Sequence, residues 1–437
     1  MSATHAPAPV GEAEVGALSA ARGEPEWMRA LRLEALAAYR RLGLPSWDRT
    51  DPKAFKLDGV TLPDAVYGNG ANAFPSELSA QLQLASAPQN TLVLGARGRL
   101  YAHLDAALRS QGVLLLDLHT ALCEHPELVQ RYFAQTDLTP GEDKFTALHC
   151  ALWTGGAFVY VPKGVVVEAP LQIITWAEDE AVDLFPHIIV AAEREAAVTV
   201  IERQLSRGDA FRRYVSAVEV SAAAAAQVRY GCIQDLSEVN SPNYTIRRGV
   251  TARDAKLEWV VADFGSSLAR SLTRSRLDGE GSESYSVTVF FGSGRQHLDT
   301  GVTMQHLGRH TTADMLTRGV LTAEARSVYR GLTDIERGAR GTSSFQTEKT
   351  LMLSADARAD AIPGLEIDDS DVSASHSATT GQIDPVQLFY LMSRGLDRTA
   401  AVRLIVDGFF APVLGKIGVE GVDAEILRII DRKMEHA

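Results

Sequence analysis

The chain has 437 residues, of which 46% are hydrophobic and 22% charged, and its formal net charge is −12 at pH 7. Binding to nucleic-acid phosphates depends on clustered Lys and Arg, so this acidic balance argues against a nucleic-acid partner. No apolar run reaches the about 18 residues needed to cross a bilayer, so we expect no membrane-spanning segment. Only three cysteines occur, Cys123, Cys150 and Cys232, and none forms a C-x-x-C motif. This argues against a disulfide framework or a thiolate metal site made by this chain alone.

The N-terminal third mixes a polar tail with short, varied segments. Residues 1–24 are rich in Ala, Pro, Gly and Glu and have neither a basic nor an apolar leader region, which predicts a disordered tail and a cytoplasmic protein. Residues 25–42 place their apolar side chains near one face of a helix. Another helical pattern covers residues 119–136, and we interpret residues 25–143 as an N-terminal α/β region.

The pattern changes at Lys144. From there to residue 381, β-branched and aromatic runs are punctuated by Gly and Pro without a helical period, which predicts strands. Small residues in turn-like segments recur, the last four at steps of about fifteen to eighteen residues, as expected for stacked coils. These segments are 195–198, 254–257, 323–326, 338–340, 356–358 and 371–373. Small side chains fit where a coil turns a corner, so residues 144–381 are predicted to form a parallel β-helix. The alternative is an antiparallel sandwich, but only Asp278-Gly279 could turn a hairpin there.

Residues 366–394 join the strand region to a helical one. A single histidine, His376, lies between serines, and Asp384-Pro385 is a good helix start because Asp can cap and Pro suits the first turn. Residues 382–437 are predicted to form a C-terminal helical domain. Its three helices are expected at 385–394, at 398–417 with a weak point at 408–412, and at 423–436. The second helix is too apolar for one buried side, so these helices cap the solenoid, dock a partner, or do both.

Other chemistry-bearing residues are interpreted as structural. His306 and His310 are spaced as ligands on a helix, but their stretch resembles strand and turn. Cys150 and Cys232 lie in apolar strand contexts, where buried, inert thiols are common. The chain has no G-x-x-x-x-G-K-[ST] loop, so it is not expected to hydrolyse nucleotides.

Four stretches together resemble the SufB/SufD family of the Suf iron-sulfur cluster assembly system. They are PEWMRALRLEAL, FTALHCALWTGGAFVYVPKGVVVEAPLQI, TADMLTRGVLTAEARSVYRGLTDIERGARGTSSFQTEKTLMLS and SASHSATTGQIDPVQLFYLMSRGL. The resemblance spans residues 25–418. The N-terminal P-E-W-x-x-x-L-R helix and the absence of any cysteine between residues 346 and 381 favour the SufD type over the SufB type.

The resemblance implies a right-handed parallel β-helix, paired with SufB, whose C-terminal helices bind the ATPase SufC. The matching histidine, His376, is then expected to face a SufB cysteine and to act as an interfacial metal or cluster ligand. Many SufD-type chains carry a cysteine two residues earlier, where this one has Ala374, so a ligand from this stretch would be imidazole alone. The SufC-contacting side chains are expected to be Leu388, Phe389, Leu404, Phe409 and Phe410.

These observations predict a non-enzymatic scaffold subunit that supports de novo cluster assembly and iron entry. No cofactor is expected on this chain alone, only a transient iron-sulfur cluster at the SufB interface. The chain is expected to form a homodimer in isolation, because an open strand edge pairs readily. One alternative is a SufB-type scaffold that itself receives the cluster. Another is a β-helix carbohydrate-active enzyme, which would need clustered carboxylates along a groove. Without the resemblance, His376 would be interpreted as a surface histidine bonded to its neighbours.

Overall fold

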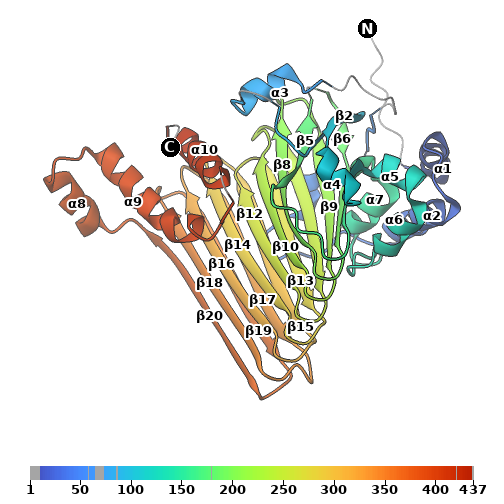
Figure 1. Ribbon diagram of the computed structural model, residues 1–437. Helices are drawn as coiled ribbons and strands as arrows, with labels where there is room; N and C mark the ends of the chain where they lie inside the picture. The colour runs from blue at the N-terminus through green and yellow to red at the C-terminus, as the bar shows by residue number, and fades with distance from the viewer. Residues whose placement is uncertain are drawn as a thin grey trace, which may run out of the picture.

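Two large sheets, sheet A and sheet B, face each other along most of the chain in the computed structural model (Figure 1). The structure describes residues 10–57, 59–63, 73–84, 87–178, 180–419 and 421–435. From β4 (Gly155–Val161) onward the strands pair in parallel and alternate between the sheets, so the chain winds as a solenoid. The predicted parallel β-helix with helical ends is confirmed.

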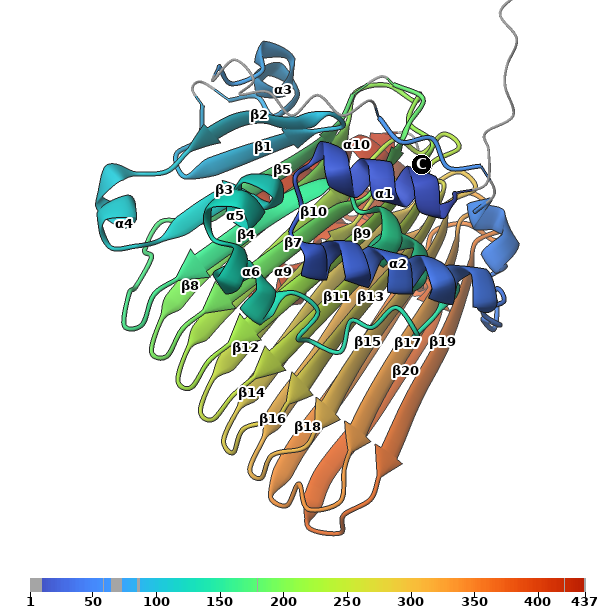
Figure 2. The same ribbon diagram turned by 90° about the vertical axis from the view of Figure 1, so that its right-hand side faces the viewer.

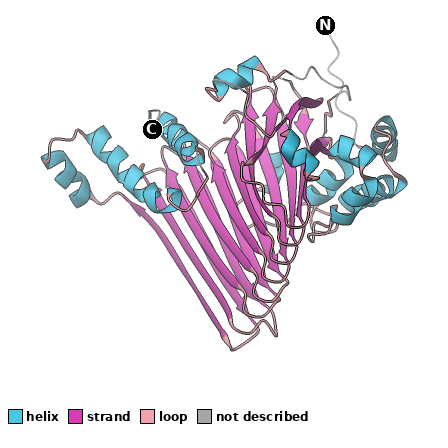
Figure 3. Ribbon diagram, viewed as in Figure 1, coloured by secondary structure: helices cyan, strands magenta, loops and turns pink. Residues whose placement is uncertain are grey.

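The strands of the two sheets are given in spatial order. Sheet A contains β2 (Gly98–His103), β1 (Thr91–Gly95), β5 (Leu171–Ala177), β8 (Ala197–Ser206), β10 (Gln227–Asp235), β12 (Lys256–Asp263), β14 (Glu283–Gly292), β16 (Thr312–Leu321), β18 (Thr342–Met352) and β20 (Val372–Gln382). Sheet B contains β19 (Arg358–Ile367), β17 (Arg326–Ile335), β15 (His297–His306), β13 (Leu268–Leu277), β11 (Pro242–Thr251), β9 (Arg213–Ala222), β7 (Pro186–Ala192), β4 and β3 (Leu114–Asp117), with β6 (Asp183–Leu184) beside β9. Figure 3 shows how strands dominate the centre of the molecule and helices its two ends.

Each full coil contains one strand of each sheet. Lys256 pairs with Glu283 and Glu283 with Thr312, steps of 27 and 29 residues. The predicted repeat of about half that length therefore corresponds to one strand and its corner, not to a complete coil. Small residues do occupy the corners, where their side chains are buried: Ala196, Ala226, Ala255, Ala325, Ala339 and Ala357.

The lumen between the sheets changes character along the solenoid. Its first coils are filled by aliphatic side chains, such as Val200, Val218 and Leu257, because inward and outward residues alternate along each strand. Its later coils also contain a small apolar cluster around Met304 and Met315, but they bury many hydroxyl, amide and carboxyl groups as well. These are Ser271, Thr273, Thr300, Thr317, Thr333, Ser344, Gln346, Glu348 and Thr350.

Helices and two antiparallel strand pairs close the N-terminal end. The β1–β2 and β3–β4 pairs end the two sheets. Helices α1 (Glu12–Ala21) and α2 (Glu26–Arg41) lie across sheet B (Figure 2). The remaining elements here are the 3-10 helix Pro52–Phe55, α3 (Ser76–Gln81), α4 (Ala106–Ser110), α5 (Leu118–Glu124), α6 (Pro126–Tyr132) and α7 (Lys144–Leu152).

Two predictions for this end are wrong. The expected disordered tail contains α1, whose Val15 packs into the same apolar cluster as α2; residues 1–9 lie outside the described residues. The strands expected from Lys144 begin only at Gly155, because residues 144–152 form α7. The Asp143 carboxylate caps α7 by accepting from the Phe145 and Thr146 amides, both at 2.8 Å. This helix is buried almost all round, so it lacks the polar face that reveals a helix in sequence.

Three C-terminal helices follow β20. They are α8 (Pro385–Ser393), α9 (Arg398–Leu414) and α10 (Val422–Glu435), close to the predicted bounds. The prediction of a weak point at residues 408–412 is wrong, because α9 continues through Pro412. Phe410 and Val413 on this part of the helix pack against the outer face of sheet A. No helix of the described residues is long and apolar enough to span a membrane.

Candidate functional site

The last coil leaves the C-terminal end of the solenoid open. Strand β20 pairs only with β18, and β19 only with β17, so each presents one unpaired backbone edge. No described helix lies over these two edges in Figure 1, whereas the opposite end is covered. An unpaired edge of ten or eleven residues is a template for pairing with another strand.

His376 lies in the middle of this exposed edge strand. It stands in register with Gln346 of β18, and paired residues in a parallel ladder project to the same face. The Gln346 amide crosses the lumen, because its Nε2 donates to the Gly364 carbonyl of β19 in sheet B at 2.9 Å. His376 therefore occupies a lumen-facing position, and it is exposed because no further coil covers it. The sequence placed it at a boundary between architectures, whereas the structure places it inside the last strand.

A buried carboxyl group lies one position further along the same face. Glu348 is 1% exposed and pairs in register with Ala378, two residues beyond His376. Burial raises the pKa of Glu348, an effect partly offset by the Thr350 hydroxyl, which donates to it, and by the nearby backbone N–H of Thr379. Among the described residues, no Lys, Arg or His pairs with this carboxylate, and its Oε2 atom has no hydrogen-bond partner.

The sequence contains a signal for the burial of Glu348, but the signal is ambiguous. Strict alternation through residues 342–350 assigns Gln346 and Glu348 to one face of the strand, which the structure shows to be the buried face. Charged residues are usually on the solvent side of a strand, so the alternation alone does not indicate that Glu348 is buried. Only the fold shows that this side faces the lumen.

The five side chains predicted to contact SufC are not on one surface. Phe389 and Leu404 are 72% and 51% exposed, but Leu388 and Phe410 are only 8% and 0% exposed. Phe410 packs against sheet A, and Phe409 lies under the Arg318 guanidinium, 4.9 Å from the ring centroid. The exposed apolar surface, which we call the α8 patch, consists of Val386, Phe389, Tyr390, Met392 and Leu404. Figure 1 shows α8 projecting away from the sheets.

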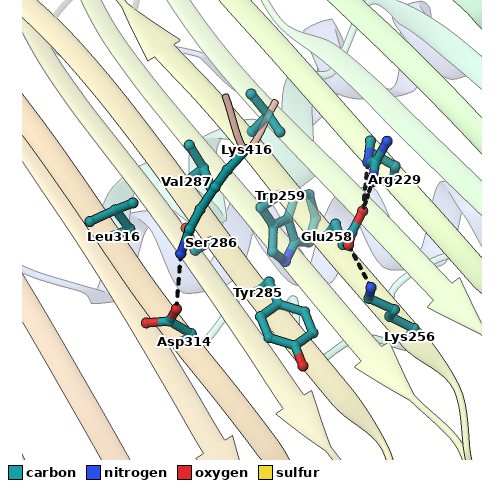
Figure 4. Close-up of a pocket in the computed structure, with 11 residues that line it drawn as sticks. Arg229, Lys256, Glu258, Trp259, Tyr285, Ser286, Val287, Asp314, Leu316 and Lys416 are labelled. Atoms are coloured by element: carbon teal, nitrogen blue, oxygen red, sulfur yellow. Dashed lines mark hydrogen bonds and ion pairs between the residues drawn. The ribbon is translucent and has the colours of Figure 1, made fainter. Parts of the chain in front are cut away.

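A cavity of about 250 Å³ lies on the outer face of sheet A beside the C-terminal helices (Figure 4). Its charged groups neutralise one another. Glu258 pairs with Lys256 at 2.7 Å and with Arg229, and Lys416 pairs with Asp314 at 3.4 Å. Both carboxylates are thus held in ion pairs, which does not suit the free acid and base of a glycoside hydrolase.

His306, Cys150 and Cys232 have structural surroundings, as expected. The buried His306 ring bonds to the Thr311 hydroxyl at 2.9 Å, and burial lowers its pKa to about 4. Cys150 and Cys232 are buried, and burial raises the pKa of both thiols. In the described part of the chain, no three His, Cys, Asp or Glu side chains gather as a metal site. His376 and Glu348 alone are thus an incomplete ligand set.

The fold and this open end define a class of protein: a β-solenoid scaffold whose last coil exposes pairing edges and one imidazole. Residues 174–409 match the family described as SUF system FeS cluster assembly, SufBD core domain, and residues 19–173 match the SufBD protein N-terminal region. The chain belongs to the SufBD family of iron-sulfur cluster assembly proteins, as its motifs predicted.

Individual relatives refine this assignment. The chain is 34% identical over 418 residues to the iron-sulfur cluster assembly protein SufD of Bacillus subtilis, covering 94% of this chain and 95% of that protein. It is 28% identical over 429 residues to SufB of the same organism, covering 96% and 91%. A SufBD family protein of Staphylococcus epidermidis is 29% identical over 429 residues, covering 96% and 91%. The chain thus shows higher identity to this SufD than to this SufB.

Proposed function

We propose that the chain is a SufD-type, non-enzymatic scaffold subunit that supports de novo cluster assembly and iron entry. It pairs with SufB through the open end of the solenoid. The observation that carries this proposal is the placement of His376 on the lumen-facing side of an unpaired strand edge. A second β-solenoid docking there would continue both sheets and bring its own side chains to the imidazole.

The His376 site fits one half of an interfacial site. Neutral imidazole binds iron and replaces thiolate in some clusters. Ala374 and Ala378 flank His376 on the same face, so this chain offers no thiolate there. The cysteine ligands come from SufB, and any cluster is transient and shared rather than held by this chain alone.

SufC binds the α8 patch in this proposal. Four of its five residues lie on α8, which buries only Leu388, and a helix with so much exposed apolar surface is typical of a partner contact. The rest of the helical domain is anchored to sheet A. The Arg203 guanidinium donates to Glu425, and the Lys433 ammonium donates to the Phe264 carbonyl. ATP-driven closure of SufC subunits on this chain and on SufB would then strain the shared edge and expose its ligands.

The test of the cluster site is His376→Ala in the complex co-expressed with SufB and SufC. We expect the iron and acid-labile sulfide content to fall severalfold, while the subunits still co-purify. The matched control is His310→Ala, which removes an exposed turn histidine from the same solenoid. Unchanged cluster content in His376→Ala would refute the ligand role.

The test of the SufC contact uses the exposed residues alone. The double variant Phe389→Ser, Leu404→Ser should weaken SufC capture in a pull-down by at least about tenfold, because exposed aromatic and aliphatic anchors dominate such contacts. Lys349→Ser, on the outer face of β18, is the control and should capture SufC normally. If deletion of residues 385–437, which removes the whole α8 patch, left capture intact, the SufC assignment would be wrong.

Three further experiments test the alternatives and the oligomeric state. A chain that takes up several irons alone during anaerobic reconstitution would be a SufB-type scaffold, whereas the proposed subunit needs its partner. The same open edge supports a homodimer in isolation, which light scattering of the purified chain would detect. Turnover of polyuronates by the purified chain would favour the carbohydrate enzyme.

A further inference from the structure

Two acceptor oxygens in the last coil lack hydrogen-bond donors. They are Gln346 Oε1 and Glu348 Oε2, and both belong to inward-facing side chains of β18. A buried oxygen without a donor costs about 1–3 kcal/mol, and more when it belongs to a carboxylate. Buried carboxylates are normally paired with a cation, and among the described residues Glu348 has none. The end of the lumen thus contains acceptors that lack a positive partner.

His376 lies beside both groups. It pairs in register with Gln346, and Glu348 lies diagonally across, one inward position further along β18. Strands lie about 4.8 Å apart and rise about 3.3 Å per residue, so the Cβ atoms of His376 and Glu348 are roughly 8 Å apart. An imidazole and a carboxylate can span that separation around one metal ion, since each ligand atom lies about 2.1 Å from the metal. The residue paired with Glu348 is Ala378, which adds only a methyl group on this face.

We propose that Glu348 is a second metal ligand at the open end, binding a divalent iron-type cation together with His376. The proposal rests on the proposed function, because it extends the His376 site inward. Imidazole with carboxylate is a pair of donors that suits divalent iron, manganese or cobalt. Thiolates from a partner would complete the coordination when the two solenoids join.

Access to Glu348 is through the edge strand. Strand β20 is held on one side only, by β18, so it can move away locally more easily than any strand inside the sheets. Once the strand closes again, the 1% exposure of Glu348 shields the ion from water. Iron would thus enter from the open end and be held between the lumen and the edge.

The test is a titration of the purified full chain with Co²⁺, followed by calorimetry and by the visible absorption of the bound ion. We expect the wild-type chain to bind one Co²⁺ at a site that both Glu348→Gln and His376→Ala weaken by at least about tenfold. Glu366→Gln is the matched control, because it removes an exposed carboxylate from the outer face of the neighbouring edge strand β19. Its affinity should stay within about twofold of wild type, well under 1 kcal/mol.

A loss of Co²⁺ binding in Glu348→Gln can be distinguished from a loss of folding. Glu348→Gln keeps the side-chain shape and the acceptor for Thr350 but removes a buried charge, so its melting temperature should equal or exceed that of the wild type. If Glu348→Gln binds Co²⁺ as tightly as the wild type, Glu348 is a protonated carboxyl group bonded within the lumen, and the proposal is overturned. Absence of a Co²⁺ site that depends on His376 would also overturn it. Neither result would refute the proposed function. That function is tested separately, by the cluster content of the complex that carries His376→Ala.

Discussion

The two ends of the solenoid differ in what covers the final strands. At the N-terminal end, the antiparallel strands β2 and β3 end the sheets and helices pack beside them, and Trp153, Phe158 and Ile189 lie in one continuous apolar cluster. At the other end, β19 and β20 have free edges, and the lumen behind them is polar. The first end packs against helices of the same chain. The second leaves the β19 and β20 edges open, and the proposed partner would pair with them.

The largest effect on stability is expected at the closed end, from Arg32→Met. The fully buried Arg32 guanidinium donates to Glu24 at 2.7 Å and to the Ala151 and Trp153 carbonyls at 3.0 Å. Its removal leaves the buried Glu24 carboxylate with only Arg22, 4.0 Å away, and takes one donor from each carbonyl, so the free energy of unfolding should fall by about 3–5 kcal/mol. Denaturant unfolding measures this loss. The control, Arg29→Met, removes an exposed arginine from the same helix and should change it by under about 0.5 kcal/mol.

The next largest effect is a loss of stability at low pH, and it is expected from the buried His306. Burial lowers the pKa of His306 to about 4 from its ordinary value of 6.5. The unfolded chain therefore binds a proton at this residue as the pH falls below 6.5, while the folded chain does so only near pH 4. Stability is unaffected above pH 6.5 and is lost progressively below it, by about 3 kcal/mol at pH 4.

His306→Asn should remove that share of the acid sensitivity, which thermal unfolding between pH 7 and pH 4 would measure. Asn can retain a bond to the Thr311 hydroxyl. His310→Asn is the control, since His310 is exposed and its left-handed backbone suits asparagine. A pH profile identical in both variants would show that His306 does not carry the effect.

The smallest effect on stability is expected at the open end. His376→Ala removes an exposed side chain without hydrogen bonds to the described residues, so the free energy of unfolding should change by under about 0.5 kcal/mol. The same variant should nevertheless lose cluster content in the complex. A loss of stability comparable to that of Arg32→Met would mean that His376 is structural, and the contrast between the two ends would fail.

Much of the architecture is predictable from local pattern. Alternation and small corner residues predicted the parallel coils, and Asp384 and Asp397 precede helices that begin where capping predicts, at Pro385 and Arg398. The expected cytoplasmic location stays a prediction. The two failures at the N-terminal end concern helices without a clear helical period: α7 is buried almost all round, and α1 joins the apolar cluster through Val15.

The candidate site was only half predictable from the sequence. Motif resemblance identified His376, because its neighbours are contiguous in sequence. Glu348 precedes it by 28 residues, and the two become neighbours only because one coil brings β18 and β20 into register. Likewise, the sequence predicted that both Phe389 and Phe410 contact SufC, whereas the structure shows Phe389 exposed and Phe410 buried.

The sequence by itself therefore determined the parallel solenoid, the helical ends, the family and one ligand candidate, since all of these depend on residues close together in the chain. Only the tertiary structure decided which end stays open, which side of each strand faces the lumen, and which apolar residues remain on the surface. These depend on long-range packing, because a strand pattern defines two faces but does not state which face another sheet will cover. The open end, where His376 lies on the strand next to that of Glu348, is therefore visible only in the tertiary structure.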